Sequence, residues 1–416
     1  MVFGLSWSAG RTPFLAAPFP SLASPRTRNS RLKAHLGATL WAGLALLLPC
    51  SFDTEAKEQP ILSVLITIDV ETSSGCTKAE GCFPPPISDR ILGEHEGVFY
   101  GTPLIMDLLE KRDMRGTFFV NAYLDSFYQE DEIRAVVEEI VQRGHSVQFH
   151  AHEEFRCFRY CKEEDAACRK SCLKNDSYLG GNSLDKQLEI LEEGARNIQR
   201  WSGTYPVAFR GGSWDADRVT LDALRILGIP LEFSLSGFEH KLADQFSVNR
   251  VTTKDGITEV PVYLYRQSTP FKFKPRYWDI ESGTFLEHKV LLQEALDSGL
   301  KTAVLVMHSF SFCRRDLGCP NQTNIDRFDR LLAFIDAHPM MQTITTDQFL
   351  SQYRQAPEKF EGSGYVPSAS YFLVVYRSFV QFGESWKHAT FFCANIFAVL
   401  IILVVIAYLV RRVYLR

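Results

Sequence analysis

The segment ILSVLITI, residues 61–68, constrains the fold of this chain more than any other stretch. It is a nearly continuous apolar run rich in β-branched residues, whereas a strand with one face in water alternates apolar and polar residues. Such a run is typical of a strand buried on both faces, as in a parallel sheet covered by helices. We therefore expect this segment to be a central strand of an α/β domain.

Strand-like and helical segments alternate along the rest of the body of the chain. The 416 residues, 46% of them hydrophobic, suffice for one large α/β domain or two smaller ones. The expected strands are 115–120, 145–150, 206–212, 229–235, 258–265, 301–310 and 341–346. The expected helices are 102–114, 131–144, 183–203, which has Ser183 as a candidate N-cap, 217–228, 285–299 and 324–338. Repeated strand–helix units predict a parallel sheet or barrel.

Polar residues that can do chemistry follow several of these strands directly. They are Asp69, Glu71, His150, His152, Glu154, Arg210, Trp214 and His308. In a barrel of parallel strands, the carboxyl ends of all strands open onto one face, where such barrels carry their active sites. We therefore expect these side chains to share one site.

The residue types in this set suit a catalytic divalent metal. An acidic residue and two histidines form a recognised ligand set, because three protein ligands leave one position open for water. A bound Zn²⁺-like ion lowers the pKa of that water toward about 7 and polarises a carbonyl group. A free carboxylate can then take a proton, and a separate histidine can protonate the leaving group. In TIDVE, Asp69 and Glu71 offer one base and one ligand.

Four motifs in this order resemble those of the NodB-homology polysaccharide deacetylases, carbohydrate esterase family four. The motifs are TIDVE, RGHSVQFHAHEEF, FRGGSWDAD and VMHSF, and the resemblance covers roughly residues 61–350. It implies a distorted (β/α) barrel and metal-dependent removal of an acyl group, above all N-acetyl, from an amino sugar. It also implies one bound divalent metal, with Zn²⁺ the first choice.

The resemblance implies roles for five residues. Asp69 matches the catalytic base, Arg210 the arginine that orients this base, and His308 the general acid. His150 matches the first metal-binding histidine, and Trp214 takes the aromatic position of the substrate groove.

The chain also departs from the family pattern. The usual second aspartate is Val70, so the metal carboxylate has to be Glu71 or Asp69 itself. The usual second histidine position is Glu154; His152 is the natural substitute, and Glu154 is an alternative ligand.

Two further positions of the family pattern differ. The proline that usually follows the arginine motif is Gly212, and LEFSLSGF stands where an aspartate-led strand is expected, with no convincing version of the usual tryptophan motif.

The cysteines predict disulfides rather than thiols. Eight of the 10 cysteines fall in local sets in polar stretches. The C-x3-C-x6-C-x3-C set, placed on two short antiparallel helices, predicts Cys157–Cys172 and Cys161–Cys168; the other pairs are Cys76–Cys82 and Cys313–Cys319. Zinc is the alternative for the four-cysteine set, although its spacing differs from C-x2-C knuckles.

Sequons at Asn175 and Asn321 predict glycosylation if the source is eukaryotic.

Two apolar segments lie outside this body. Residues 36–50 follow basic residues and are short, which favours a secretory signal peptide, with an uncleaved anchor as the alternative. Residues 390–410 carry no charge and suit a transmembrane helix, and the arginines after it predict a cytoplasmic C-terminus and an extracytoplasmic catalytic domain. A buried core helix is the other interpretation. The net charge of -4 gives no hint of nucleic-acid binding.

These observations predict one domain order and leave several functions open. The expected regions are a signal peptide or N-terminal anchor (1–56), a catalytic barrel (57–355) with a Cys-rich insert (155–180), a linker and juxtamembrane stretch (356–389), a transmembrane helix (390–410) and a cytoplasmic tail (411–416).

The first functional hypothesis is a metal-dependent hydrolase that removes N-acetyl groups from an amino sugar of a polysaccharide or glycoconjugate. The alternatives are a deacylase or deformylase of a lipid-linked sugar, and an inactive membrane-tethered carbohydrate-binding protein. The missing second aspartate favours inactivity, whereas Asp69, Arg210 and His308 together favour an enzyme.

Overall fold

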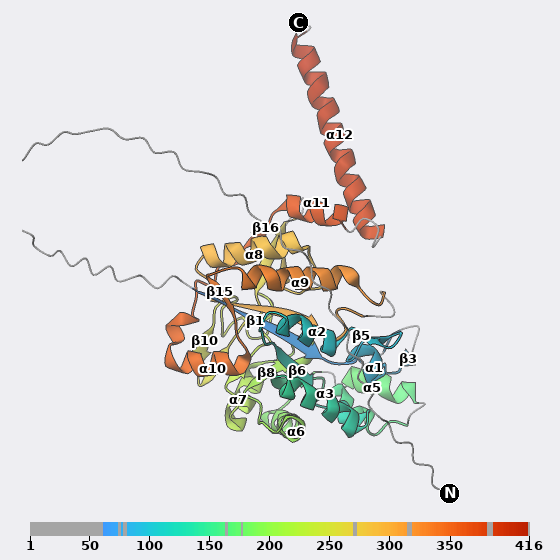
Figure 1. The fold of residues 1–416 in the computed structure, drawn as a ribbon, viewed down its shortest axis with the longest axis vertical. Coiled ribbons are helices and arrows are strands. Elements are labelled where there is room, and N and C mark those ends of the chain that lie inside the picture. The colour runs from blue at the N-terminus through green and yellow to red at the C-terminus, as the bar shows by residue number, and fades with distance from the viewer. Residues whose placement is uncertain are drawn as a thin grey trace, which may run out of the picture. The chain divides into compact units, whose positions relative to one another are not determined.

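The computed structural model describes residues 61–73, 76–77, 81–162, 165–175, 178–268, 273–313, 318–380 and 386–414 (Figure 1). The expected N-terminal signal or anchor, residues 1–56, lies outside the described residues. So do the side chains of Cys76, Cys82 and Asn175 and all of Arg416.

A curled, mostly parallel sheet forms the centre of the domain. Its strands run in the order β10-β11-β9-β8-β7-β6-β1-β14, with β15 also paired to β1. Their bounds are β1 Leu62–Val70, β6 Thr117–Asn121, β7 Ser146–Ala151, β8 Ala208–Gly211, β9 Leu231–Glu232, β10 Thr252–Lys254, β11 Ile257–Glu259, β14 Thr302–His308 and β15 Met341–Thr343. Only the β10–β11 pair is antiparallel. With its helices the sheet makes a half-barrel, which agrees with the distorted (β/α) barrel that the resemblance implies.

The first strand is central, as its apolar run indicates. Every residue of β1 is buried. Val64, Ile66 and Ile68 belong to one hydrophobic core, whereas Leu65 belongs to a second core on the other face of the sheet. Fully burying one such side chain contributes about 1.5–3 kcal/mol. A strand covered on both faces therefore needs no alternation of polar residues.

Helices connect the parallel strands. They are α2 Thr102–Glu110, α3 Glu130–Gln142, α6 Leu184–Ser202, α7 Arg218–Leu227, α8 Phe285–Asp297, α9 Gln322–Asp336 and α10 Thr346–Gln355. Helices α3 and α6 pack against each other and against β7. The N-cap prediction for α6 is confirmed, because the Ser183 hydroxyl accepts a hydrogen bond from the Lys186 amide. The sequence analysis missed α10, whose cap is a capping box between Thr345 and Gln348.

The expected strand 258–265 is in fact two strands in two sheets. Strand β11 ends at Glu259, and β12, Leu264–Ser268, pairs with β13, Phe273–Tyr277, and with β16, Ser368–Ala369. Pro261 lies in the break and has no amide hydrogen to donate to a ladder.

The remaining short elements lie in the connections. They are β2 Cys76–Thr77, β3 Gly81–Cys82, α1 Ile87–Arg90, β4 Glu94–His95, β5 Val98–Phe99, the 3₁₀ turns η1 Leu124–Ser126, η2 Gly212–Trp214 and η3 Pro357–Lys359, and the insert helices α4 Glu154–Phe158 and α5 Ala166–Asn175. In the ladder of β2 and β3, Cys76 stands opposite Cys82.

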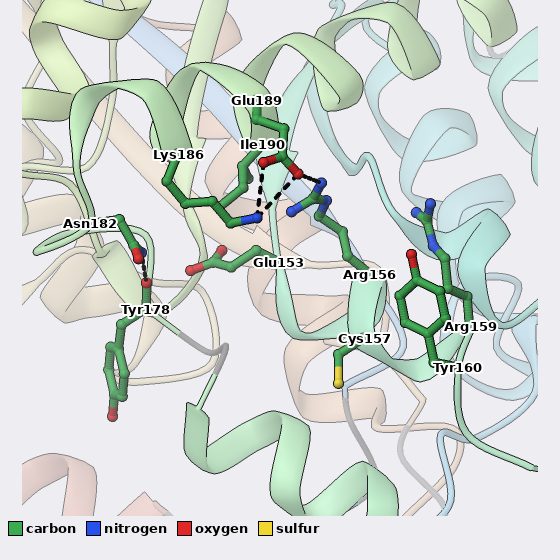
Figure 2. A pocket seen from close by; sticks show the side chains of 10 residues that line it. All are labelled: Glu153, Arg156, Cys157, Arg159, Tyr160, Tyr178, Asn182, Lys186, Glu189 and Ile190. Atoms are coloured by element: carbon green, nitrogen blue, oxygen red, sulfur yellow. Dashed lines mark hydrogen bonds and ion pairs between the residues drawn. The ribbon is translucent and has the colours of Figure 1, made fainter.

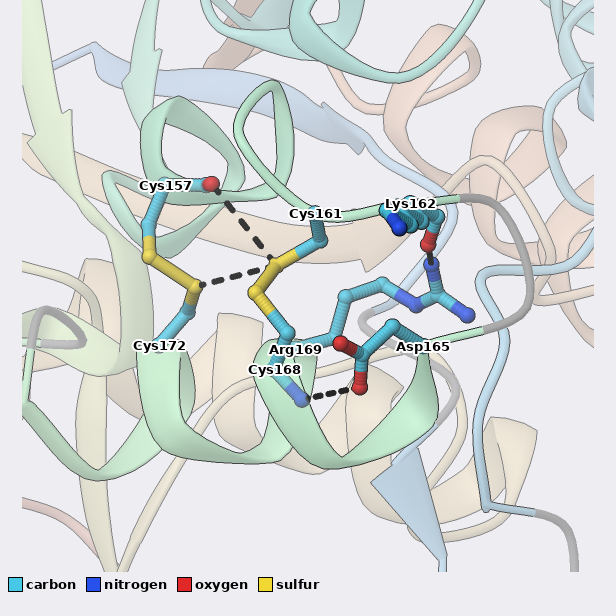
Figure 3. The surroundings of a disulfide bond; sticks show 7 residues. All are labelled: Cys157, Cys161, Lys162, Asp165, Cys168, Arg169 and Cys172. Atoms are coloured by element: carbon cyan, nitrogen blue, oxygen red, sulfur yellow. Dashed lines mark hydrogen bonds between the residues drawn. A yellow bond between two sulfur atoms is a disulfide. The ribbon is translucent and has the colours of Figure 1, made fainter.

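Two disulfides fasten the Cys-rich insert (Figure 3). Cys157 is bonded to Cys172 and Cys161 to Cys168, the pairing predicted from the spacing. All four sulfurs are thereby used, so none is a thiolate available to zinc. A further disulfide joins Cys313 to Cys319, also as predicted. The two disulfides of the insert hold α4 and α5 together directly after the histidine motif.

The segment after α10 is packed on the domain rather than extended from it. Phe360 is buried against the core residues Phe349 and Tyr353, and β16 adds to the small sheet beside β12. Helices α11, Tyr371–Val380, and α12, Trp386–Tyr414, follow. Residues Ala389–Arg412 of α12 are long and apolar enough to cross a membrane, with a mean hydropathy of 2.9.

Candidate active site

The polar residues predicted to share a site do gather at the carboxyl ends of the parallel strands. In the β1–β14 ladder Asp69 stands beside His308, and in the β7–β8 ladder His150 stands beside Arg210. Successive side chains on a strand point to opposite faces, so the shared register sets which of them converge. Hydrogen bonds from Ser309, through its amide to the Asp69 carbonyl and its hydroxyl to the Glu71 carbonyl, hold the end of β14 against β1.

Asp69 is held by a buried arginine. Nη1 of Arg210 donates to Oδ1 of Asp69 over 2.6 Å, and Nη2 donates to Oγ1 of Thr67 over 2.9 Å. The guanidinium lies 4.2 Å from the centre of the Phe119 ring and 5.4 Å from that of Trp214. Because the guanidinium is fully buried beside these rings, Arg210 fixes the direction in which Asp69 points.

Glu71, His150 and His152 form a compact cluster of possible metal ligands. Oε2 of Glu71 lies 3.2 Å from Nε2 of His150 and 2.5 Å from Nε2 of His152. One ligand atom from each of the three residues lies within 4.8 Å of the others. The His152 side chain thus faces the same small volume as those of Glu71 and His150.

The other ring nitrogen of each histidine is engaged behind the cluster. Nδ1 of His150 donates to the carbonyl oxygen of Arg210 over 2.9 Å, and Nδ1 of His152 donates to Oε1 of Glu154 over 3.0 Å. A proton on Nδ1 leaves Nε2 as the atom that can bind a metal, and such partners usually fix ligand histidines. Glu154 therefore contacts the ring nitrogen of His152 opposite to the one that faces Glu71.

The charges of the cluster are strongly coupled. Burial works against the ionised form of Glu71, but His152 and the histidine hydrogen bonds hold the pKa of this carboxyl well below its usual range. Burial likewise opposes the charged form of His152, yet Glu71 and Glu154 raise its pKa well above the usual histidine value. The three residues fit a divalent ion, because a buried carboxylate and two Nε2 atoms with engaged Nδ1 partners form a catalytic donor set.

Gly212 makes room for His152. A Cβ atom on Gly212 would lie 2.1 Å from the carbonyl oxygen of Ala151 and 2.9 Å from Nδ1 of His152. The position of the His152 ring therefore depends on the absence of a side chain at residue 212. The next residues, Ser213 and Trp214, have φ values of 52° and 64°, an uncommon conformation for non-glycine residues.

His308 lies at the end of β14 with its own carboxylate partner. Nδ1 of His308 lies 3.1 Å from Oε1 of Glu281, which also accepts a hydrogen bond from the Ser311 hydroxyl over 2.8 Å. Burial opposes the charged form of His308, but Glu281 and the negative charges of Glu71 and Asp69 outweigh it and raise its pKa to about 9. The imidazole is therefore a proton donor at neutral pH.

Comparison with known proteins agrees with this geometry. Residues 99–231 match the model of the polysaccharide deacetylase family. The chain carries a polysaccharide deacetylase domain. The match runs from the end of β5 to the start of β9 and so includes His150, His152 and Arg210. Asp69 and His308 lie outside the matched segment, and the fold brings them to it.

Solved structures similar to this chain include deacetylases and esterases. A polysaccharide deacetylase candidate from Mycobacterium smegmatis is 17% identical, with a TM-score of 0.45, covering 74% of this chain and 94% of that one. The peptidoglycan deacetylase PdaC from Bacillus subtilis is 13% identical, with a TM-score of 0.36 and coverages of 72% and 96%.

A family 4 acetyl xylan esterase from Clostridium thermocellum, solved with a cobalt ion, is 13% identical, with a TM-score of 0.36 and coverages of 70% and 91%. At these identities and scores a likeness says nothing about the reaction of this chain. A search of curated proteins found no match to the sequence.

Some residues of the deacetylase domain that contact the site escaped the sequence analysis. Glu281, which holds His308, lies in the segment WDIES just after β13. Tyr277, the last residue of β13, packs edge-on against Trp214 with ring centres 5.2 Å apart. The sequence feature that could have pointed to them is the acidic and aromatic composition of YWDIES. This segment lies far in sequence from the four motifs.

A cavity of about 260 Å³ lies next to the histidine motif of the deacetylase domain (Figure 2). Figure 2 shows Glu153 pointing into it, between Lys186 of α6 and Tyr178. Among the residues that line this cavity, Arg156 and Lys186 both pair with Glu189. Burial, with a smaller effect of Glu154, raises the pKa of Glu153 to about 8.

Proposed function

We propose that this chain hydrolyses the amide bond of an N-acetylated amino sugar in a polysaccharide or glycoconjugate and releases acetate. One observation carries the proposal: a carboxylate held by an arginine, a three-residue ligand cluster and a histidine paired with a carboxylate converge at the same strand ends. A base, a metal site and an acid are the three components of metal-assisted amide hydrolysis.

Glu71, His150 and His152 would hold the metal, for which Zn²⁺ is the first candidate because two imidazoles and a carboxylate suit it. A divalent ion there would supply Lewis-acid polarisation of the acyl carbonyl and lower the pKa of bound water. The engaged Nδ1 atoms of both histidines keep the rings oriented with Nε2 toward the cluster.

Asp69 acts as the general base in this proposal. It is buried, its Oδ1 is taken by Arg210, and the arginine is immobilised by Thr67 and the Phe119 ring. A carboxylate fixed in this way takes a proton from the attacking water without first reorienting.

His308 acts as the general acid that protonates the departing sugar nitrogen. Its raised pKa keeps the imidazole protonated at neutral pH, and Glu281 on Nδ1 leaves Nε2 as the atom that donates. The half-buried Trp214, packed against Tyr277, offers an aromatic surface on which a sugar ring can stack. This surface adjoins the base through the contact of Trp214 with Arg210.

We further propose that α12 anchors this catalytic domain to a membrane. Arg411 and Arg412 at the end of the helix favour a cytoplasmic C-terminus and therefore an extracytoplasmic deacetylase domain.

Acetate release from an N-acetylglucosamine oligosaccharide tests the proposed reaction, with the full chain solubilised in detergent and loaded with Zn²⁺. The Glu71→Gln variant should lose bound metal and at least about 100-fold in rate. Glu110→Gln is a matched control, because Glu110 also pairs with a histidine, His145, but at the far end of α2. Acetate release that is equal in the wild type and in Glu71→Gln would contradict the proposal.

A further inference from the structure

Helix α11 has two unlike faces. Phe372, Tyr376, Phe379 and Val380 expose 84%, 45%, 58% and 48% of their surface. Their spacing of four, three and one residues places them on one side of a helix. This outward face of α11 consists of large apolar or aromatic side chains without a charged group.

The opposite face of α11 is fixed to the deacetylase domain. Val374, Arg377 and Ser378 are buried. Nη1 of Arg377 lies 3.6 Å from Oε1 of Glu287 in the first turn of α8, and Glu287 is itself buried. The single charge of α11 is thus turned inward and paired. An ion pair removed from water in this way resists separation, because either partner alone would be a buried unpaired charge.

Both ends of α11 also contact the N-terminal part of α12. The rings of Tyr371 and Phe391 and those of Phe379 and Phe392 pack together, and the Tyr371 hydroxyl donates a hydrogen bond to Oδ1 of Asn395. These partners lie in the first two turns of the apolar stretch Ala389–Arg412. Since an α-helix rises about 1.5 Å per residue, Asn395 lies within about 10 Å of the start of that stretch. If α12 crosses a bilayer, α11 lies at the level of the bilayer surface.

We propose that the outward face of α11 inserts into the headgroup boundary of the bilayer and, through the Arg377–Glu287 pair, holds the deacetylase domain in a fixed orientation to the membrane. The proposal rests on the membrane anchorage proposed for α12. A bilayer is the fitting partner, because α11 packs against the first turns of the apolar stretch Ala389–Arg412 and its outward face is rich in the aromatic side chains that favour membrane interfaces. Its burial depth would be the roughly 5–10 Å typical of interfacial helices.

Site-directed fluorescence on the full chain tests the insertion. Cys393 is the free cysteine among the described residues, so Cys393→Ser is the background for single cysteines at Phe372 and Phe379. Each is labelled with an environment-sensitive fluorophore after reconstitution into phosphatidylcholine vesicles. A label at Ile226, exposed on α7, reports water, and a label at Leu403, in the middle of α12, reports lipid.

The proposal predicts that lipids with a nitroxide near the headgroup quench the Phe372 and Phe379 labels at least twofold more than the Ile226 label. Labels on α11 that match the Ile226 label, while the Leu403 label is lipid-quenched, would overturn the insertion and leave the anchor in place. A Leu403 label that is not quenched by lipids with a nitroxide deep in the acyl chain would overturn both. Energy transfer between labelled chains without lipid quenching would assign the face to a second copy of this chain instead. Acetate release is measured separately in detergent, so failure of the deacetylase proposal is distinguishable from each of these results.

The orientation claim has its own test. Energy transfer from the Ile226 label to an acceptor on the membrane surface reports how the domain stands over the bilayer. Arg377→Gln should change this transfer while the Phe372 label stays lipid-quenched, and Arg377→Lys should restore it. Equal transfer in the wild type and in Arg377→Gln would contradict a fixed orientation.

Discussion

Arg210 donates a hydrogen bond of 2.6 Å to Asp69, and neither side chain has appreciable contact with solvent. The pair joins the ends of two strands that are far apart in the sequence, β1 and β8, and the backbone carbonyl of the same arginine holds Nδ1 of His150. One residue thus orients the proposed base and one proposed metal ligand.

Replacing Arg210 by lysine should therefore impair turnover more than metal binding. Lysine cannot donate to Asp69 and Thr67 from one planar group, so kcat should fall about 100-fold. The backbone carbonyl that holds His150 is unchanged, so the metal content should stay near that of the wild type. Arg112→Lys, which alters a pair with Asp329 on the surface, is the control. Parallel loss of metal and turnover in Arg210→Lys would show that its role is structural.

Gly212→Ala tests the dependence of His152 on its neighbour. The added Cβ would clash with the carbonyl of Ala151 and crowd Nδ1 of His152, so the ring has to move. We expect about 10-fold to 100-fold weaker metal binding, as for other changes that disturb the support of a ligand. Gly237→Ala, where no heavy atom lies within 4 Å of the new Cβ, should bind metal like the wild type. Unchanged affinity in Gly212→Ala would remove His152 from the ligand set.

The pH dependence of kcat should reflect His308. A general acid has to be protonated, so activity should persist through neutral pH and decline as the pH rises through about 9, the pKa of His308. Glu281→Gln removes the hydrogen-bonded carboxylate that raises this pKa. The alkaline limb should therefore move down by at least about one pH unit. If kcat declines at the same alkaline pH in the wild type and in Glu281→Gln, the decline belongs to a group other than His308.

Glu153 should make the domain less stable at alkaline pH. Its folded-state pKa of about 8 lies above the ordinary value, so the protonated form is favoured in the folded state. The contribution of protonated Glu153 to the free energy of unfolding is complete below about pH 4. It is lost as the pH rises toward 8, at up to about 1.4 kcal/mol per pH unit. Glu153→Gln should flatten the free energy of unfolding between pH 5 and 8. Glu110→Gln should leave this pH dependence unchanged, because the pKa of Glu110 is lowered. Identical slopes of unfolding free energy against pH in the wild type and in Glu153→Gln would contradict the account.

The sequence was sufficient to predict the central strand and the shared position of the site residues. The apolar run of β1 could only be buried on both faces, and parallel strands necessarily bring Asp69, His150 and Arg210 to one edge. Glu281 could not be predicted, because its contact with His308 depends on how the connection after β13 returns to the end of β14.

Packing also overrode local composition near the C-terminus. The Gly- and Pro-containing stretch 356–370 was expected to be a linker, yet Phe360 and Ala369 are buried in the domain. Two apolar residues with a core and a strand edge within reach suffice to order a segment whose other residues favour turns.

Metal content tests the central claim most directly. The full chain, solubilised and incubated with Zn²⁺ before dialysis, should retain about one equivalent, and the His150→Ala/His152→Ala double variant should retain none. His145→Ala, which removes a buried histidine outside the site, should retain the metal. A wild-type chain that holds no divalent ion even after loading with excess metal would contradict the account and favour an inactive carbohydrate-binding protein.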